Sequence, residues 1–112
     1  MIEDRVTHQP FRCDVESHRE TVRVRPVGEL DLATVDVVEE QLSELKAAGF
    51  TGLTLDLRDV RFLDSTGLRM ILLWDAEARA DGFVFRLIEG PPAVRRLFDL
   101  TGTTEKFDYV DP

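Results

Sequence analysis

The sequence predicts an α/β fold: a mixed sheet of four to five strands with helices packed mainly on one face. Segments of alternating and of helically spaced apolar residues follow one another as strand, strand, helix, strand, helix, strand, helix. Strand–helix–strand connections favour parallel neighbours, and the opening strand pair adds an antiparallel hairpin. With 112 residues, of which 43% are hydrophobic, the chain can bury a core without disulfides. We expect a single domain over residues 11–112 after a flexible lead-in over residues 1–10.

The first half of the chain contains the predicted hairpin and a helix. Apolar and polar residues alternate over residues 11–15 and 22–25, and the polar residues 17–20 between them indicate a turn. Pro26 cannot donate to a sheet, so an unpaired or bulged position is expected there. Gly49 is well placed to end the following helix in a left-handed conformation. The apolar face of that helix consists of Val35, Val38, Leu42 and Leu45.

The second half alternates strands with helices. A strand is predicted over residues 53–57, and a helix over residues 65–80. The middle of this helix is apolar nearly all round, so it should be the most buried helix. Another strand is predicted over residues 83–88, and a short third helix after Pro92, since proline fits the first turn. A turn and a short strand around residues 107–110 are expected to end the chain.

The charge of the chain restricts its partners. The formal net charge of −8 disfavours binding to nucleic acid and to anionic membrane surfaces, and suits a basic protein surface. No apolar run approaches a membrane span, and residues 1–10 lack the apolar segment of a signal peptide. The single cysteine, Cys13, is interpreted as a small core residue. We therefore expect a cytoplasmic protein, and nothing requires more than a monomer.

Three residues that cap helices well, Asp64, Ser65 and Thr66, stand in a row before Gly67 at the start of the most buried helix. Helix capping alone is one interpretation of them. A hydroxyl at a helix N-terminus is also a good phosphate site, because free N–H groups and the helix dipole stabilise negative charge. Gly67 costs helix stability but would let another molecule approach the backbone.

The run from Val60 to Leu68, with its Asp64-Ser65-Thr66-Gly67-Leu68, resembles the signature of STAS domains of the anti-sigma factor antagonist type. The run Gly28-Glu29-Leu30-Asp31 resembles the second motif of that family, at the end of a strand and before the first helix. The similarity covers roughly residues 11–107, with strands and helices in the order of the family. The resemblance therefore implies a STAS-like sheet.

The resemblance also implies a phosphorylation-controlled regulator that is not an enzyme. In such systems the unphosphorylated antagonist binds an anti-sigma factor, itself a serine kinase of the histidine-kinase-like ATPase fold, and a sigma factor is released. The kinase then phosphorylates the serine after the motif aspartate, here Ser65, and the complex dissociates; Thr66 is a secondary candidate. A metal-dependent serine phosphatase restores the binding form. ATP and magnesium belong to the partner, so no cofactor or metal site is expected. Partner-binding positions implied by the motifs are Gly28, Glu29, Asp31, Asp64, Ser65, Thr66 and Gly67.

Arg69 departs from the family pattern, in which a small residue often follows the motif leucine. It lies one turn beyond Ser65, where it could pair with a phosphate and contact the partner. An ordinary exposed helical arginine is an equally good interpretation.

Two enzyme-like functions fit the sequence less well. A serine hydrolase needs a general base, but the two histidines, His8 and His18, lie in the polar N-terminal part and no Gly-x-Ser-x-Gly elbow is present. A phosphoaspartate receiver needs a magnesium site and a nearby lysine. The acids Asp56, Asp59 and Asp64 are instead interpreted as a solvated loop with Asp64 capping a helix.

Two binding functions also compete with the phosphorylation switch. Trp74 and the phenylalanines could line a ligand pocket, although core packing explains them better. Within the family, STAS domains also serve as unphosphorylated scaffolds, in stress-signalling assemblies and as accessory domains of transporters. An intact Asp-Ser-Thr-Gly favours the phosphorylation switch.

Overall fold

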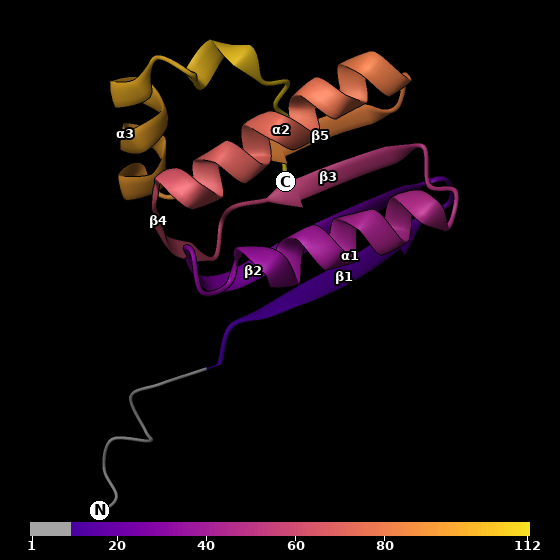
Figure 1. Cartoon of the computed structure of the whole chain (residues 1–112), viewed down its shortest axis with the longest axis horizontal. Coiled ribbons are helices and arrows are strands. Elements are labelled where there is room, and N and C mark those ends of the chain that lie inside the picture. Colours follow the sequence, from indigo (N-terminus) through magenta and orange to yellow (C-terminus); the bar gives the residue numbers. More distant parts are fainter. Residues whose placement is uncertain (1–9) are drawn as a thin grey trace, which may run out of the picture.

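The computed structural model describes residues 10–112, so the expected lead-in lies, apart from Pro10, outside the described residues. The predicted fold class is confirmed: a five-stranded mixed sheet is packed against helices (Figure 1). The elements in chain order are β1 (Arg12–His18), β2 (Thr21–Leu30), α1 (Val35–Ala47), β3 (Gly52–Asp56), β4 (Val60–Leu63), α2 (Ser65–Asp81), β5 (Val84–Ile88), α3 (Pro92–Thr101) and the 3₁₀ turn η2 (Thr104–Lys106).

The sheet has the order β1-β2-β3-β5, and β4 pairs separately with β2. β1 and β2 form the predicted antiparallel hairpin, while the pairs β2–β3, β2–β4 and β3–β5 are parallel. The hairpin turn is shorter than predicted, because the strands continue to His18 and from Thr21. Arg19 in the turn has a φ of 61°, the left-handed conformation that a tight hairpin turn requires.

β2 changes its parallel neighbour halfway along its length. It pairs with β3 as far as Val24, opposite Leu55, and with β4 from Gly28, opposite Val60. Pro26 lies between these two pairings, where a residue without an N–H is tolerated. β4 is absent from the sequence-based prediction, which placed only a short connection there. The change of neighbour brings β4 and the start of α2 beside the end of β2 (Figure 1).

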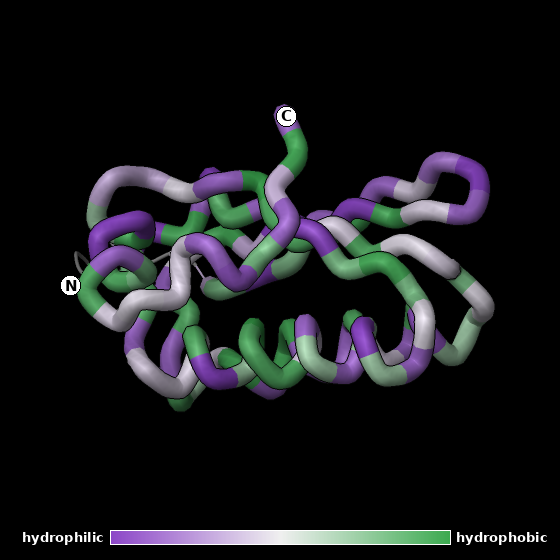
Figure 2. Tube along the Cα trace, turned by 90° about the horizontal axis from the view of Figure 1, so that it is seen from above, coloured by the Kyte–Doolittle hydropathy of each residue, from purple (hydrophilic) through white to green (hydrophobic). Residues whose placement is uncertain are grey.

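α1 and α2 form a layer on one face of the sheet, as Figure 2 shows from the side. The predicted face of α1 is confirmed: Val38 and Leu42 are fully buried. Trp74 of α2 is buried, and its Nε1 donates a hydrogen bond of 3.0 Å to Glu39 of α1. Leu73 corrects the expectation of an all-round buried helix, because 56% of its surface is exposed.

The predicted end of α1 is confirmed, whereas the predicted C-terminal strand is reduced to one bridge. Gly49 has a φ of 100°, as predicted for the residue after α1. The predicted strand at residues 107–110 is a single parallel bridge between Leu87 and Tyr109. α3 packs against β4 at one end of the sheet (Figure 1). Within residues 10–112, no helix is both long and apolar enough to span a membrane.

Candidate functional site

The start of α2 is capped as predicted. Oδ1 of Asp64 accepts a hydrogen bond from the N–H of Gly67 at 3.0 Å, and Asp64 itself is extended. Ser65 is the first residue of the helix and is exposed, whereas Thr66 is half-buried. The N–H groups of Ser65 and Thr66 are among the first four of the helix, which have no intrahelical acceptor. The hydroxyl of Ser65 is therefore accessible and close to free backbone donors.

The pairing of β2 with β4 brings the two sequence motifs together. The N–H of Gly28 donates to the carbonyl of Asp59 at 3.1 Å, and the N–H of Asp64 donates to the carbonyl of Leu30 at 3.3 Å. The end of β2 thus holds both ends of β4. Residues 28–31 and residues 64–67, which the sequence places far apart, form one continuous region in the fold.

Thr34 organises the loop between β2 and α1. Its hydroxyl donates to the carbonyl of Glu29 at 2.6 Å and accepts from the N–H of Asp31 at 3.0 Å. The carboxylate of Asp31 accepts from the N–H of Ala33 at 3.0 Å. Glu29 is exposed. Asp31 is half-buried, and its carboxylate is already engaged in a hydrogen bond within its own loop. Sequence reasoning missed Thr34, although an aspartate followed three residues later by threonine is a pattern of such side-chain-stabilised turns.

The two motif glycines are buried, which changes the interpretation of Gly67. A Cβ on Gly67 would lie 2.5 Å from Cδ1 of Leu63 and 2.9 Å from the carbonyl oxygen of Leu30. The expectation that Gly67 opens the backbone to another molecule is therefore wrong, because its own chain fills that space. Gly28 has a φ of 124° and packs against Phe11. Both glycines shape the region from within and leave Glu29, Ser65 and Arg69 as its exposed predicted residues.

Two large apolar side chains near the site are exposed, and sequence reasoning missed both. Leu32, in the loop after β2, is 75% exposed, and Phe62, on β4, is 51% exposed. Phe62 lies opposite Glu29 in the pairing of β4 with β2. A leucine within a polar loop is the signal that could have identified Leu32. Phe62 had no comparable signal, because its neighbour Arg61 is also exposed and no alternation marks the strand.

The acids before β4 form ion pairs. Asp56 is fully buried, and its carboxylate accepts hydrogen bonds from Nη2 of Arg58 at 2.7 Å and from Nε at 3.0 Å. Asp59 pairs with Nε of Arg25 at 2.7 Å. Burial raises the pKa of Asp56, but the hydrogen bonds and charge of Arg58 outweigh it, so the pKa lies below its ordinary value. The predicted solvated loop is therefore wrong for Asp56.

These ion pairs also leave no acid cluster for a receiver-type metal site. In the described part of the chain, no group of three metal-ligating side chains converges. Asp56 and Asp59 are each engaged by an arginine, and Asp64 caps α2. His18 ends β1, and His8 lies outside the described residues.

Comparisons with known proteins all find STAS domains or anti-sigma factor antagonists. A family model described as Mlab, STAS domain, matches residues 13–108. The anti-sigma-B factor antagonist of Bacillus subtilis (strain 168) is 30% identical over 98 residues, which cover 88% of this chain and 89% of the relative. The crystal structure of an anti-sigma factor antagonist from Mycobacterium paratuberculosis is 29% identical, with a TM-score of 0.78 over 92% of this chain and 87% of that one. The Bacillus cell fate determinant SpoIIAA in its phosphorylated form is 25% identical, with a TM-score of 0.68 over 92% of this chain and 91% of that one.

Proposed function

The chain belongs to the STAS domain family, and on this basis we propose that it acts as an anti-sigma factor antagonist. In its unphosphorylated form it binds an anti-sigma factor in the cytoplasm, and the sigma factor held by that protein is released. It acts by binding and not by catalysis. The relatives named as antagonists of anti-sigma-B and anti-sigma-F factors support this proposal, since they match along most of their lengths.

Ser65 is the phosphoacceptor in this proposal, and its geometry is the observation that carries it. The side chain is exposed at the first position of α2, directly after the capping Asp64. A kinase that is also the anti-sigma factor can therefore reach the hydroxyl without unfolding the helix. A serine phosphatase would return the protein to its binding form. The related SpoIIAA, whose structure is known in a phosphorylated form, supports the assignment of a phosphorylation switch.

A phosphate on Ser65 should leave the fold intact. The free N–H groups of the first turn and the positive end of the helix dipole stabilise the added charge. Gly67, whose N–H already serves Asp64, lies on the buried side of the turn. Phosphorylation therefore acts on whatever covers this region and not on the stability of the chain.

The surface around Ser65 suits a protein partner that dissociates when Ser65 is phosphorylated. We name Glu29, Leu32, Phe62, Ser65 and Arg69 the switch surface; all five are exposed. Leu32 and Phe62 supply apolar area that a partner would bury. In the free protein a phosphate on Ser65 stays hydrated. In the complex it would lose that hydration beside the buried apolar side chains, and this cost would weaken binding. Arg69, on the next turn of α2, is placed to attract that phosphate in the free state.

The test compares two baits, Ser65→Ala and Ser65→Asp, in pull-downs from native lysate with mass-spectrometric identification. Ser65→Ala should retain an anti-sigma factor kinase, and Ser65→Asp should retain much less of it. Aspartate carries less charge than phosphate, so some residual binding is expected. Ser43→Asp, an exposed serine in the middle of α1, is the matched control and should bind like the unaltered chain.

Phosphate transfer identifies the acceptor. The retained kinase, given ATP and magnesium, should add one phosphate to the unaltered chain and to Thr66→Ala, but none to Ser65→Ala. Phosphorylation of Ser65→Ala would move the acceptor to Thr66 or elsewhere. Equal retention of the same partner by both Ser65 baits would contradict the switch and favour a scaffold or transporter-accessory role.

A further inference from the structure

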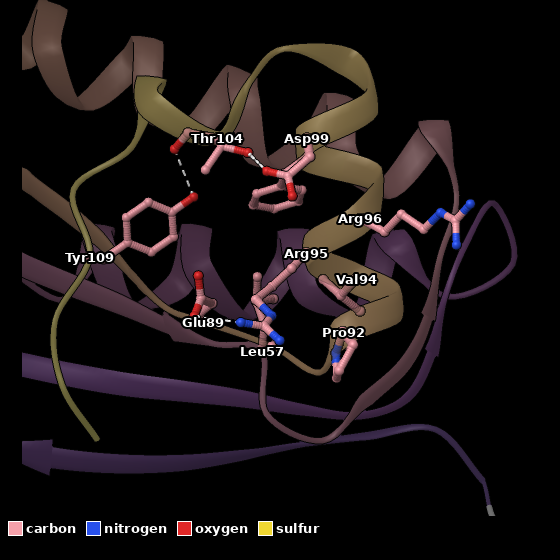
Figure 3. Close-up of a pocket in the computed structure, with 11 residues that line it drawn as sticks. Leu57, Glu89, Pro92, Val94, Arg95, Arg96, Asp99, Thr104 and Tyr109 are labelled. Atoms are coloured by element: carbon pink, nitrogen blue, oxygen red, sulfur yellow. Dashed lines mark hydrogen bonds and ion pairs between the residues drawn. The ribbon is translucent and has the colours of Figure 1, made fainter.

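A cavity of about 340 Å³ lies between α3 and the C-terminal segment (Figure 3). It opens where β3 and β5 end, and the carboxyl ends of parallel strands are where open α/β sheets commonly bind ligands. Its floor is apolar, formed by Leu57, Val94 and Phe98, all nearly inaccessible to solvent. The volume lies at the lower end of the range for small-molecule sites.

Tyr109 forms an aromatic wall of this cavity and is held in place. Its backbone is bridged to Leu87 of β5, and its hydroxyl donates to the carbonyl of Thr104 at 2.9 Å. Tyr109 is 37% exposed, and its ring borders the cavity (Figure 3). A ligand would therefore meet an aromatic surface that needs little rearrangement.

The acidic groups lie closer to the space in front of the Tyr109 ring than the guanidinium of Arg96 does. Figure 3 shows the carboxylates of Glu89 and Asp99 on either side of the space in front of Tyr109, while the guanidinium of Arg96 is directed away. Nη1 of Arg95 lies 3.6 Å from Oε1 of Glu89, a loose ion pair beyond hydrogen-bond distance. The carboxylate of Asp99 accepts from the hydroxyl of Thr104, which fixes its orientation.

The charges that act on the hydroxyl of Tyr109 are those of Glu89 and Asp99. Burial raises the pKa of Tyr109, and the negative charges of Glu89 and Asp99 raise it further. Because both carboxylates face the space in front of the ring and Arg96 is directed away, an anionic ligand is disfavoured there, whereas a cation gains from both carboxylates and from the face of the ring.

We propose that this cavity binds a small organic cation, an aliphatic amine or guanidine. Its charged group lies against Tyr109 between Glu89 and Asp99, and its carbon chain covers the apolar floor. The cation competes with Arg95 for the carboxylate of Glu89. The site does not depend on the switch at Ser65, and its test can fail while the proposed function stands.

The test titrates the full-length protein with agmatine and follows the backbone amides by two-dimensional NMR. Saturable shifts confined to the amides around Leu57, Val94 and Tyr109 are the expected result. A capped Gly-Arg-Gly peptide distinguishes the source of the cation: tighter binding of the peptide assigns the site to an arginine side chain of a protein, and tighter binding of agmatine assigns it to a free amine. Benzoate is the probe of opposite charge. No saturable shift with either cation, or the same shifts with benzoate, would overturn the proposal.

Two variants with opposite effects sharpen the test. Glu89→Gln should weaken agmatine binding roughly two- to fivefold, the loss expected for a partly exposed charge contact. Arg95→Gln removes the competing cation and should tighten binding by about the same factor. Glu105→Gln, on the exposed face of η2, is the matched charge control and should change binding less. Weaker binding by Arg95→Gln would overturn the proposed arrangement, provided that Trp74 fluorescence shows the native fold.

Discussion

Replacing Gly67 by alanine tests the packing that joins the start of α2 to the end of β2. Alanine is favoured over glycine within a helix by about 1 kcal/mol, so the substitution would stabilise an uncrowded position. The added methyl, however, would lie 2.5 Å from Cδ1 of Leu63 and 2.9 Å from the carbonyl oxygen of Leu30. The leucine side chain can rotate away, but the carbonyl belongs to the backbone of β2. Overpacking of this kind costs about 1–3 kcal/mol.

The gain in helix propensity and the cost of overpacking have opposite signs, and the overpacking cost should be the larger. We expect Gly67→Ala to lower the free energy of unfolding by about 1 kcal/mol, the difference between a mid-range overpacking cost and the propensity gain. Urea denaturation followed by fluorescence measures it, since Trp74 is the single tryptophan and is buried. An increase of about 1 kcal/mol in stability would refute the steric argument, because it would show that the alanine behaves as in an exposed helix.

A double-mutant cycle separates the two contacts. Leu63→Val removes Cδ1 and should by itself destabilise the chain by about 1 kcal/mol. In that background the cost of Gly67→Ala should fall, because only the contacts with the carbonyl oxygen and Cγ of Leu30, at 2.9 and 3.2 Å, remain. Equal costs in both backgrounds would show that Leu63 already rotates freely and that the backbone contact dominates.

The remaining predictions concern three residues: Asp56 in its ion pair, Asp64 as the cap of α2, and the half-buried Cys13. Asp56→Ala removes the charged acceptor of Arg58, whose guanidinium is one-third exposed and can be hydrated, and should lower the free energy of unfolding by about 2 kcal/mol in urea denaturation. Because the pKa of Asp56 lies below its ordinary 3.8 in the folded chain, its stabilising effect is complete at neutral pH and is lost as the pH falls below 3.8. Asp56→Asn should therefore show a weaker loss of stability with acid, and an unchanged acid transition would contradict this role. Asp64→Ala removes the acceptor for the N–H of Gly67 and should cost about 1 kcal/mol by calorimetry, whereas Asp64→Asn should cost less. Burial raises the pKa of the Cys13 thiol to about 11, so iodoacetamide at about pH 8 should react far more slowly with the folded chain than with the chain in urea. Equal alkylation rates in the two conditions would contradict the burial of this thiol.

The features that local chemistry determines could be predicted from the sequence. The apolar face of α1, the left-handed Gly49 after it and the capping of α2 by Asp64 all follow from spacing or from one side chain and its neighbouring backbone. The mixed sheet followed from the order of these elements. The roles of the partner-binding residues and of Ser65 as phosphoacceptor remain predictions that the bait and kinase experiments will test.

The features that distant residues create could not be predicted. β4 carries two exposed residues in its middle, so no alternation marked it, and it forms by pairing with β2 from Gly28 onward. Asp56 was expected in a solvated loop, but the sheet brings Arg25 beside it while Arg58 closes over it. The crowding around Gly67 likewise comes from Leu30, on another strand. Arg58 and Leu63 are local neighbours of Asp56 and Gly67, but β2, Arg25 and Leu30 are distant in sequence from the residues they contact, and periodicity carries no information about such neighbours.

The change of neighbour along β2 also determines when the switch surface exists. Glu29 and Ser65 come together only after β4 has paired with β2, and pairing between distant segments is slow to form during folding. A short peptide around Ser65 carries the serine without the opposite half of the surface, and a chain in which β4 has not yet paired with β2 carries both halves apart. A partner that contacts both Glu29 and Ser65 would thus distinguish folded from unfolded copies of the chain.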